Sequence, residues 1–320
     1  MPDGLLRHRV LFFGGKGGVG KTTLAAAISL IAAQRDDRTL LVSTDPAHST
    51  SDMLELELGP EPRKVSGSLW AMEIDPTREA DRYIDEVKAR VASLTAPRLV
   101  GEVERQIDIA RVSPGAEEAA LFDRFTRLLD ELGRSYDRLV FDTAPLGHTL
   151  RLLALPEQLT LWMRGLIGRR KKVNALHRMW RKVAGAAAGD EASHDDPVLA
   201  ALEERKTRFE RTRAVLTDPT RSAFVFVLTP ERLPLLETQR AVAVLERHRI
   251  PLGGIVVNQI ALDSSGDQDQ WLESIGAAFR RYPRYDVPRF RRDVYGLNAL
   301  HELGNAIHRM ESAAVPPSRG

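Results

Sequence analysis

A glycine-rich segment with two lysines lies near the start of the chain, between an apolar run and a helical pattern. Residues 15–22 match the phosphate-binding pattern G-x-x-x-x-G-K-[ST]. In such a loop, glycines let backbone N–H groups converge on phosphate oxygens, and the following helix adds its partial positive charge. The sequence therefore predicts a cradle for the phosphates of a nucleotide. The residues predicted to form it are Gly15, Lys16, Gly17, Gly18, Val19, Gly20, Lys21, Thr22 and Thr23.

Three side chains of this loop carry the predicted chemistry. Lys21 would neutralise the β- and γ-phosphate oxygens, and the Thr22 hydroxyl would be a ligand of Mg²⁺. Lys16 is an additional cation inside the loop. It could stabilise charge in the transition state of phosphate transfer, or it could be an exposed surface lysine.

Two aspartates follow apolar runs that read as buried strands. Asp45 comes after residues 39–43, where it could orient or deprotonate the water that attacks the γ-phosphate, or cap a helix. Asp142 ends the run 139–141 and is predicted to hold Mg²⁺, directly or through water. His48 and His148 lie in the segments that follow, where phosphate contact and simple packing both remain open.

The elements that must position these residues alternate between strand and helix. Apolar runs without polar alternation are typical of parallel strands covered on both faces. The expected strands are 10–13, 39–43, 139–141, 223–228 and 254–257, with a helix over 23–35. This pattern predicts an α/β fold with a doubly wound, mostly parallel sheet.

Two long stretches interrupt the alternation with helical periodicity. They are residues 76–134 and 156–218, which we expect to be helical insertions forming a subdomain. We expect residues 1–310 to form a single domain around the phosphate-binding loop, with these insertions, and residues 311–320 to be a disordered tail.

A basic amphipathic stretch lies within the second insertion, at about residues 156–184. Between Arg164 and Lys182 it has eight basic side chains and no acidic one, beside an apolar helical face. Packing with a solvated basic face is one interpretation. Contact with an anionic membrane or a hydrophobic client is a second, and nucleic acid a third.

Composition excludes several classes of protein. The chain has 320 residues, no cysteine, and 46 Lys+Arg against 44 Asp+Glu, a net charge of +2. Thiol chemistry and cysteine-bound metals are excluded, and we expect no stable nucleic-acid partner. No apolar run approaches the roughly 20 residues that span a bilayer, and no export signal is visible, so we expect a cytoplasmic protein.

The chain resembles the family of the arsenite-pump ATPase ArsA and the tail-anchored-protein targeting ATPases, within the deviant Walker A class of P-loop NTPases. Segments similar to that family's motifs occur in order along the chain. They are residues 15–23, 43–49, 141–151, 229–233 with 237–238, and 256–260.

The resemblance implies an Mg²⁺-dependent ATPase that dimerises face to face around ATP. Lys16 would reach the partner's phosphates and Asp45 would activate water. Glu231 and Asn258 would lie at the nucleotide, with the Asn258 amide at the adenine edge. A single P-loop implies a homodimer, and the helical insertions would bind the client, a membrane protein or another hydrophobic partner. The family's cysteine-based arsenite sensing and zinc clasp cannot occur in this chain.

Two other functions fit the same loop. A ParA/MinD-type positioning ATPase would use ATP as a dimer switch on DNA or membrane, but long helical insertions and the Thr-Asp-Pro-Ala-His-Ser sequence at 44–49 argue against it. A small-molecule kinase would have no evident use for Lys16.

Overall fold

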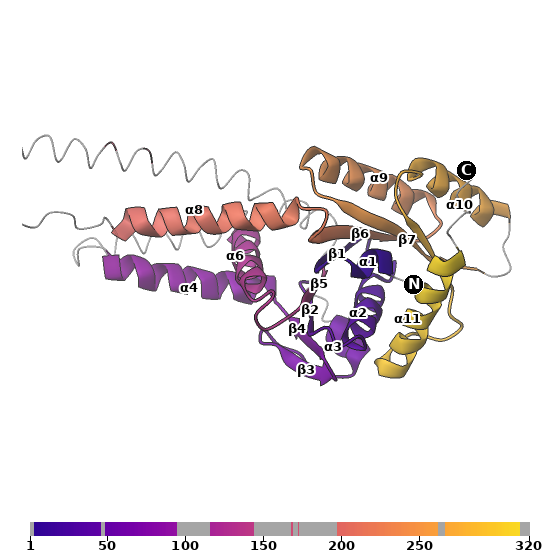
Figure 1. Cartoon of the computed structure of the whole chain (residues 1–320), viewed down its shortest axis with the longest axis horizontal. Helices are drawn as coiled ribbons and strands as arrows, with labels where there is room; N and C mark the ends of the chain where they lie inside the picture. Colours follow the sequence, from indigo (N-terminus) through magenta and orange to yellow (C-terminus); the bar gives the residue numbers. More distant parts are fainter. Residues whose placement is uncertain are drawn as a thin grey trace, which may run out of the picture.

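A computed structural model of the chain describes residues 3–45, 49–94, 116–143, 168, 172, 197–261 and 266–313. Within these residues, eight strands form one sheet with helices on both faces (Figure 1). The strands are β1 (Val10–Gly14), β2 (Thr39–Ser43), β3 (Arg63–Ser66), β4 (Leu69–Glu73), β5 (Arg138–Asp142), β6 (Ser222–Leu228), β7 (Leu252–Ile260) and β8 (Arg284–Pro288).

The strand order is β3-β4-β2-β5-β1-β6-β7-β8. All neighbouring strands run parallel except β3 and β4, which form an antiparallel hairpin. The carboxyl ends of the parallel strands therefore meet along one edge of the sheet, which is where open α/β sheets bind ligands.

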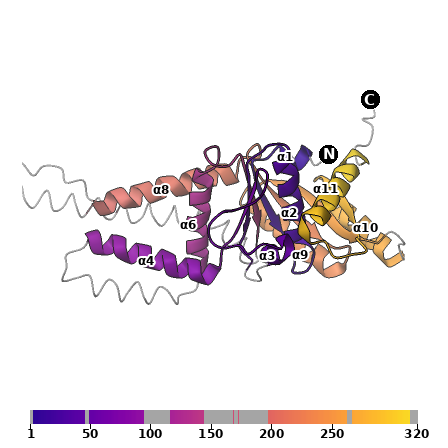
Figure 2. The same ribbon diagram turned by 90° about the horizontal axis from the view of Figure 1, so that it is seen from below.

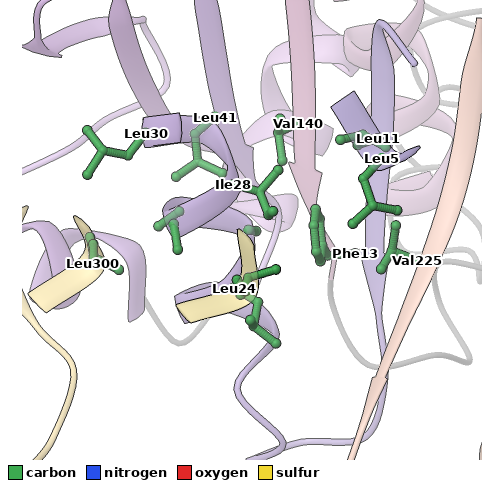
Figure 3. Packing of buried hydrophobic residues seen from close by; sticks show 14 of the residues in the cluster. Leu5, Leu11, Phe13, Leu24, Ile28, Leu30, Leu41, Val140, Val225 and Leu300 are labelled. Carbon is green, nitrogen blue, oxygen red and sulfur yellow. The ribbon is translucent and has the colours of Figure 1, made fainter. Parts of the chain in front are cut away.

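Helices cover the two faces over separate hydrophobic cores. One core packs α1 (Asp3–Leu6), α2 (Lys21–Ala33), α3 (Ser49–Leu54) and α11 (Gly296–Ala313) against the sheet. Figure 3 shows Leu24 and Ile28 of α2 among side chains of the strands, with Leu300 of α11 on the same side. The other core includes α6 (Ala116–Asp130), α8 (Pro197–Leu216), α9 (Arg232–Arg247) and α10 (Gly266–Ala278).

Three helices form what we call the helical projection: α4 (Pro76–Leu94), α6 and α8. Both α4 and α8 extend away from one side of the sheet (Figures 1 and 2). Helix α6 anchors the projection, because its Phe125 packs against Phe12 of β1 and Phe141 of β5, with ring centroids 5.5 and 4.9 Å apart. No described helix has both the length and the apolar composition needed to cross a membrane.

The predicted fold class is confirmed: the structure is an α/β protein with a doubly wound, mostly parallel sheet. The helix expected over 23–35 begins earlier, at Lys21, directly after Gly20. Three strands were not predicted, namely β3, β4 and β8. The side chains of β3 are exposed or half-buried and β8 is only partly buried, so neither has the continuous apolar run of a central strand.

Candidate nucleotide site

The glycine-rich loop connects the end of β1 to the start of α2, as its pattern requires. Gly20 caps α2 in the left-handed conformation, with φ of 90°. A Cβ at Gly20 would come within 2.3 Å of the Asn258 side-chain nitrogen, and one at Gly15 within 2.2 Å of the Val227 carbonyl oxygen. Glycine at these two positions lets β6 and β7 approach the loop closely.

The two lysines of the loop lie in different environments. The Lys21 side chain is 5% exposed, and its Nζ donates to the Lys16 carbonyl oxygen at 3.2 Å. The Lys16 ammonium is more exposed and lies 3.9 Å from Oε1 of Glu237, on α9. Lys21 is therefore held within the loop, whereas Lys16 reaches out towards α9.

Thr22 and Asp142 meet beneath the loop. The Thr22 hydroxyl donates to Oδ2 of Asp142 at 2.6 Å. Asp142 is completely buried at the end of β5, and its Oδ1 has no hydrogen-bond partner among the described residues. Burial raises the pKa of the Asp142 carboxyl to about 7, although the Thr22 hydrogen bond and the Lys21 charge oppose this change.

These oxygens suit a hard divalent cation. Mg²⁺ is usually bound by one or two carboxylates together with phosphate oxygens and water. The described residues contain no cluster of three His, Asp or Glu side chains that could hold a metal by themselves. A cation at the unpartnered Asp142 oxygen would thus depend on ligands from a bound phosphate.

Asp45 follows β2 at the same edge of the sheet. Its backbone N–H donates to the Ser43 hydroxyl at 3.3 Å, and the preceding Thr44 N–H donates to the Asp142 carbonyl oxygen at 3.0 Å. The β2 end is thereby fixed to the end of β5. Pro46, Ala47 and His48 lie outside the described residues, as does the segment 144–151 that contains His148.

The end of β7 braces the loop from the opposite side. The Asn258 side-chain amide donates to the Val19 carbonyl oxygen at 2.9 Å, across 239 positions of sequence. Asn258 also lines the cavity described next. Glu231 precedes α9 as its N-cap position and makes no side-chain capping hydrogen bond.

A cavity of about 1030 Å³ opens along this edge of the sheet. It brings together most of the predicted residues, from the loop, from β2 and from β7. Those that line it are Gly17, Gly18, Gly20, Lys21, Thr22, Thr23, Asp45 and Asn258. The other predicted residues that the structure describes do not line the cavity; they are Gly15, Lys16, Val19, Asp142 and Glu231. Asp142 contacts the lining through its hydrogen bond with Thr22.

The cavity has a further wall that contains none of the site residues predicted from the sequence. It consists of residues 288–294, directly after β8, and includes Arg289, Phe290, Arg291 and Arg292. Because β8 runs parallel to β7, its carboxyl end meets the same edge as the loop. Recognising residues 284–288 as a strand would have placed this segment at the site.

Comparison with known proteins identifies a family and relatives that match most of the chain. The sequence profile of the anion-transporting ATPase family matches residues 8–309. A candidate arsenical pump-driving ATPase, numbered 2, of Aquifex aeolicus is 33% identical over 308 residues, which cover 93% of this chain and 99% of that protein. The ATPase GET3A of Arabidopsis thaliana is 33% identical over 279 residues, covering 86% of this chain and 72% of that protein. The ATPase ASNA1 homolog 1 of Paramecium tetraurelia is 33% identical over 258 residues, 78% and 74% of the two chains.

Proposed function

Because the chain belongs to the anion-transporting ATPase family and is an ATPase, we propose that it hydrolyses Mg²⁺-bound ATP in the cavity above the glycine-rich loop. The observation that carries this proposal is the Thr22–Asp142 pair. Its unpartnered, buried carboxylate oxygen lies beneath a loop built to hold phosphates. A buried polar atom without a partner is costly unless a ligand completes it.

Each residue of the site then has a defined task. Lys21 and the loop N–H groups bind the β- and γ-phosphates. Thr22 and Asp142 hold Mg²⁺, which offsets the phosphate charge when bound. Asp45 lines the cavity and is the group we assign to orient and deprotonate the attacking water. Asn258 keeps the loop in its phosphate-binding form through the Val19 carbonyl.

We assign Lys16 to a second copy of the chain. Its ammonium is partly exposed and its ion pair with Glu237 is long, at 3.9 Å, between two side chains that are each more than a third exposed. Such a pair is weak and readily exchanged. In a homodimer with the nucleotides between the protomers, Lys16 would exchange Glu237 for the partner's phosphates and stabilise charge in the transition state.

Hydrolysis would be coupled to moving or escorting a client. The relatives' names are of two kinds. One relative is named as an ATPase that drives an arsenical pump, and the other two are named as ASNA1 and GET3A ATPases. The helical projection extends away from one side of the sheet and is the part of the chain that we assign to client binding. The basic stretch at about 156–184 lies outside the described residues, apart from two isolated positions. We place the activity in the cytoplasm, where ATP is supplied.

The Asp45→Asn variant tests this mechanism. The amide keeps the shape of the side chain but cannot accept the proton of the attacking water, so the variant should bind ATP with unchanged affinity and hydrolyse it on the order of 100-fold more slowly. Binding is measured with a fluorescent ATP analogue, hydrolysis by phosphate release, and oligomeric state by light scattering. We expect Mg²⁺ and ATP together to trap the variant as a dimer. Turnover at the wild-type rate would remove Asp45 from the mechanism, and a monomer with bound ATP would remove the assignment of Lys16.

A further inference from the structure

A buried carboxylate at the end of β4 clamps α3, the helix that follows Asp45 in the chain. Glu73 is 4% exposed. Its Oε1 accepts hydrogen bonds from the backbone N–H groups of Thr50 at 3.0 Å and Ser51 at 2.9 Å, and its Oε2 accepts one from the Ser51 hydroxyl at 2.7 Å. The carboxylate therefore fixes the first turn of α3 by three separate contacts.

The first turn of α3 touches the phosphate cradle. The Ser49 hydroxyl lies 3.3 Å from the Thr22 hydroxyl, which in turn donates to Asp142. Ser49 lines the same cavity as Asp45. A continuous chain of contacts thus connects Glu73 with the predicted Mg²⁺ ligands, although Glu73 is not among the described residues that line the cavity.

Strand pairing places Glu73 beside the other end of the same segment. In the parallel β2–β4 ladder, Glu73 lies opposite Ser43, whose hydroxyl accepts the Asp45 N–H. The Ile74 N–H donates to the Ser43 carbonyl oxygen at 2.9 Å. The end of β4 therefore holds both the end of β2, before Asp45, and the beginning of α3, after it.

The surroundings also hold the clamp in place. The Ser51 hydroxyl accepts the Leu58 N–H at 3.1 Å, and the Glu73 N–H donates to the Gly59 carbonyl oxygen at 2.9 Å. The charge of Glu73 is felt at Asp142, because it contributes to the raised pKa of that carboxyl. Glu73 could therefore act through its reach or through its charge, and the two can be separated.

We propose that Glu73 is a positioning residue for ATP hydrolysis, which acts by holding α3 and the end of β2, next to Asp45, against the phosphate cradle. The inference rests on the proposed roles of Thr22 and Asp45. Positions of reacting groups matter steeply, since a displacement of about 1 Å can reduce a rate on the order of 100-fold. Loss of the clamp should accordingly lower kcat far more than it weakens nucleotide binding, which depends mainly on the loop and Lys21.

Two substitutions separate reach from charge. Glu73→Gln keeps the length of the side chain, and its amide oxygen can still accept the two backbone N–H groups, but the charge is lost. Glu73→Asp keeps the charge but is shorter by one methylene, roughly 1.5 Å, and cannot reach all three donors. We expect the Gln variant to keep kcat within about threefold of wild type, and the Asp variant to lose about 10- to 100-fold in kcat with KM changed less than about threefold.

The matched control is Glu79, another buried carboxylate, which pairs with Arg82 on α4 at 2.6 Å and does not line the cavity. Glu79→Asp and Glu79→Gln should change the melting temperature and leave kcat unchanged.

Phosphate release, nucleotide affinity and melting temperature are measured for all four variants, with wild type and Asp45→Asn as references. A normal kcat in Glu73→Asp overturns the proposal. If Glu73→Gln is slow in the same experiment, the charge of Glu73 matters and its reach does not. A slow wild type, or a normal Asp45→Asn, points instead to failure of the proposed mechanism.

Discussion

The cavity above the glycine-rich loop and the helical projection use charged residues in opposite ways. At the cavity, Asp142 is buried with one oxygen unpartnered among the described residues, and the cavity is open around Lys21 and Thr22. In the projection, arginines meet the acidic side chains. Arg127 contacts both Glu86 and Asp123, and Arg82 contacts Glu79.

The difference shows which region requires a ligand. Burial disfavours the charged form of Asp142 more than the Thr22 hydrogen bond and the Lys21 charge favour it, so the cavity is built at the expense of stability in the free protein. In the projection, Glu79, Glu86 and Asp123 pair with arginines, and Arg205 also lies over the Tyr83 ring, 5.1 Å from its centroid. Substitutions in the two regions should therefore have different signatures.

The largest effect is expected at Lys21. Lys21→Ala removes the buried cation of the loop and with it charge-assisted hydrogen bonds to phosphate, so nucleotide affinity should fall by at least about 100-fold. Calorimetric titration with ATP measures the change. The control is Lys206→Ala on α8, where a half-buried lysine pairs with Glu210 at 3.7 Å and affinity should stay the same. Equal losses of nucleotide affinity in Lys21→Ala and Lys206→Ala would contradict the claim that only the cavity binds nucleotide.

A smaller effect, with a pH dependence, is expected at Asp142. Its pKa in the folded protein, about 7, lies above the ordinary carboxyl value. Stability conferred by the protonated form is therefore lost as pH rises from about 4 through 7. Asp142→Asn has no carboxyl to ionise and so has no such loss. Without metal or nucleotide, the free energy of unfolding of the variant minus that of wild type should therefore increase by about 2 kcal/mol between pH 5 and pH 8. Urea unfolding in EDTA measures this, and the variant should lose Mg²⁺-dependent hydrolysis.

The control for Asp142 is a carboxylate shifted in the opposite direction. Hydrogen bonding to Arg38 lowers the pKa of Asp137 to about 2, so Asp137→Asn should change stability equally at pH 5 and pH 8. A flat profile for Asp142→Asn as well would mean that the carboxylate finds a partner in the free protein.

The smallest effect is expected in the projection. Arg127→Ala removes the partner that Glu86 and Asp123 share and should lower the free energy of unfolding by about 1 kcal/mol, since the guanidinium is partly exposed. ATP affinity and kcat should remain within about twofold of wild type. The free energy is measured by urea unfolding beside Arg208→Ala, whose pair with Glu204 lies on the surface of α8 and should contribute less. Altered ATP affinity in Arg127→Ala would show that the regions are not independent.

Much of the sheet and the cradle could be predicted from local sequence. The central strands are continuous apolar runs, and the motif at 15–22 fixes the loop between β1 and α2. The edge strand β8 alternates buried and half-buried residues over only five positions, too short a signal to place the arginines that follow it. The clamp at Glu73 depends on pairing between β2 and β4, which no local pattern contains.

The cradle is assembled from distant parts of the chain, and this has a consequence for synthesis. Thr22 is hydrogen-bonded to Asp142, which lies 120 positions later in the sequence, and Val19 to Asn258, which lies 239 positions later. A ribosome makes the glycine-rich loop early and the strand that braces it late. A nascent chain that stops before β7 has the whole motif but lacks its brace and the cavity wall after β8. Full affinity for nucleotide should therefore require a chain that has been translated past residue 294.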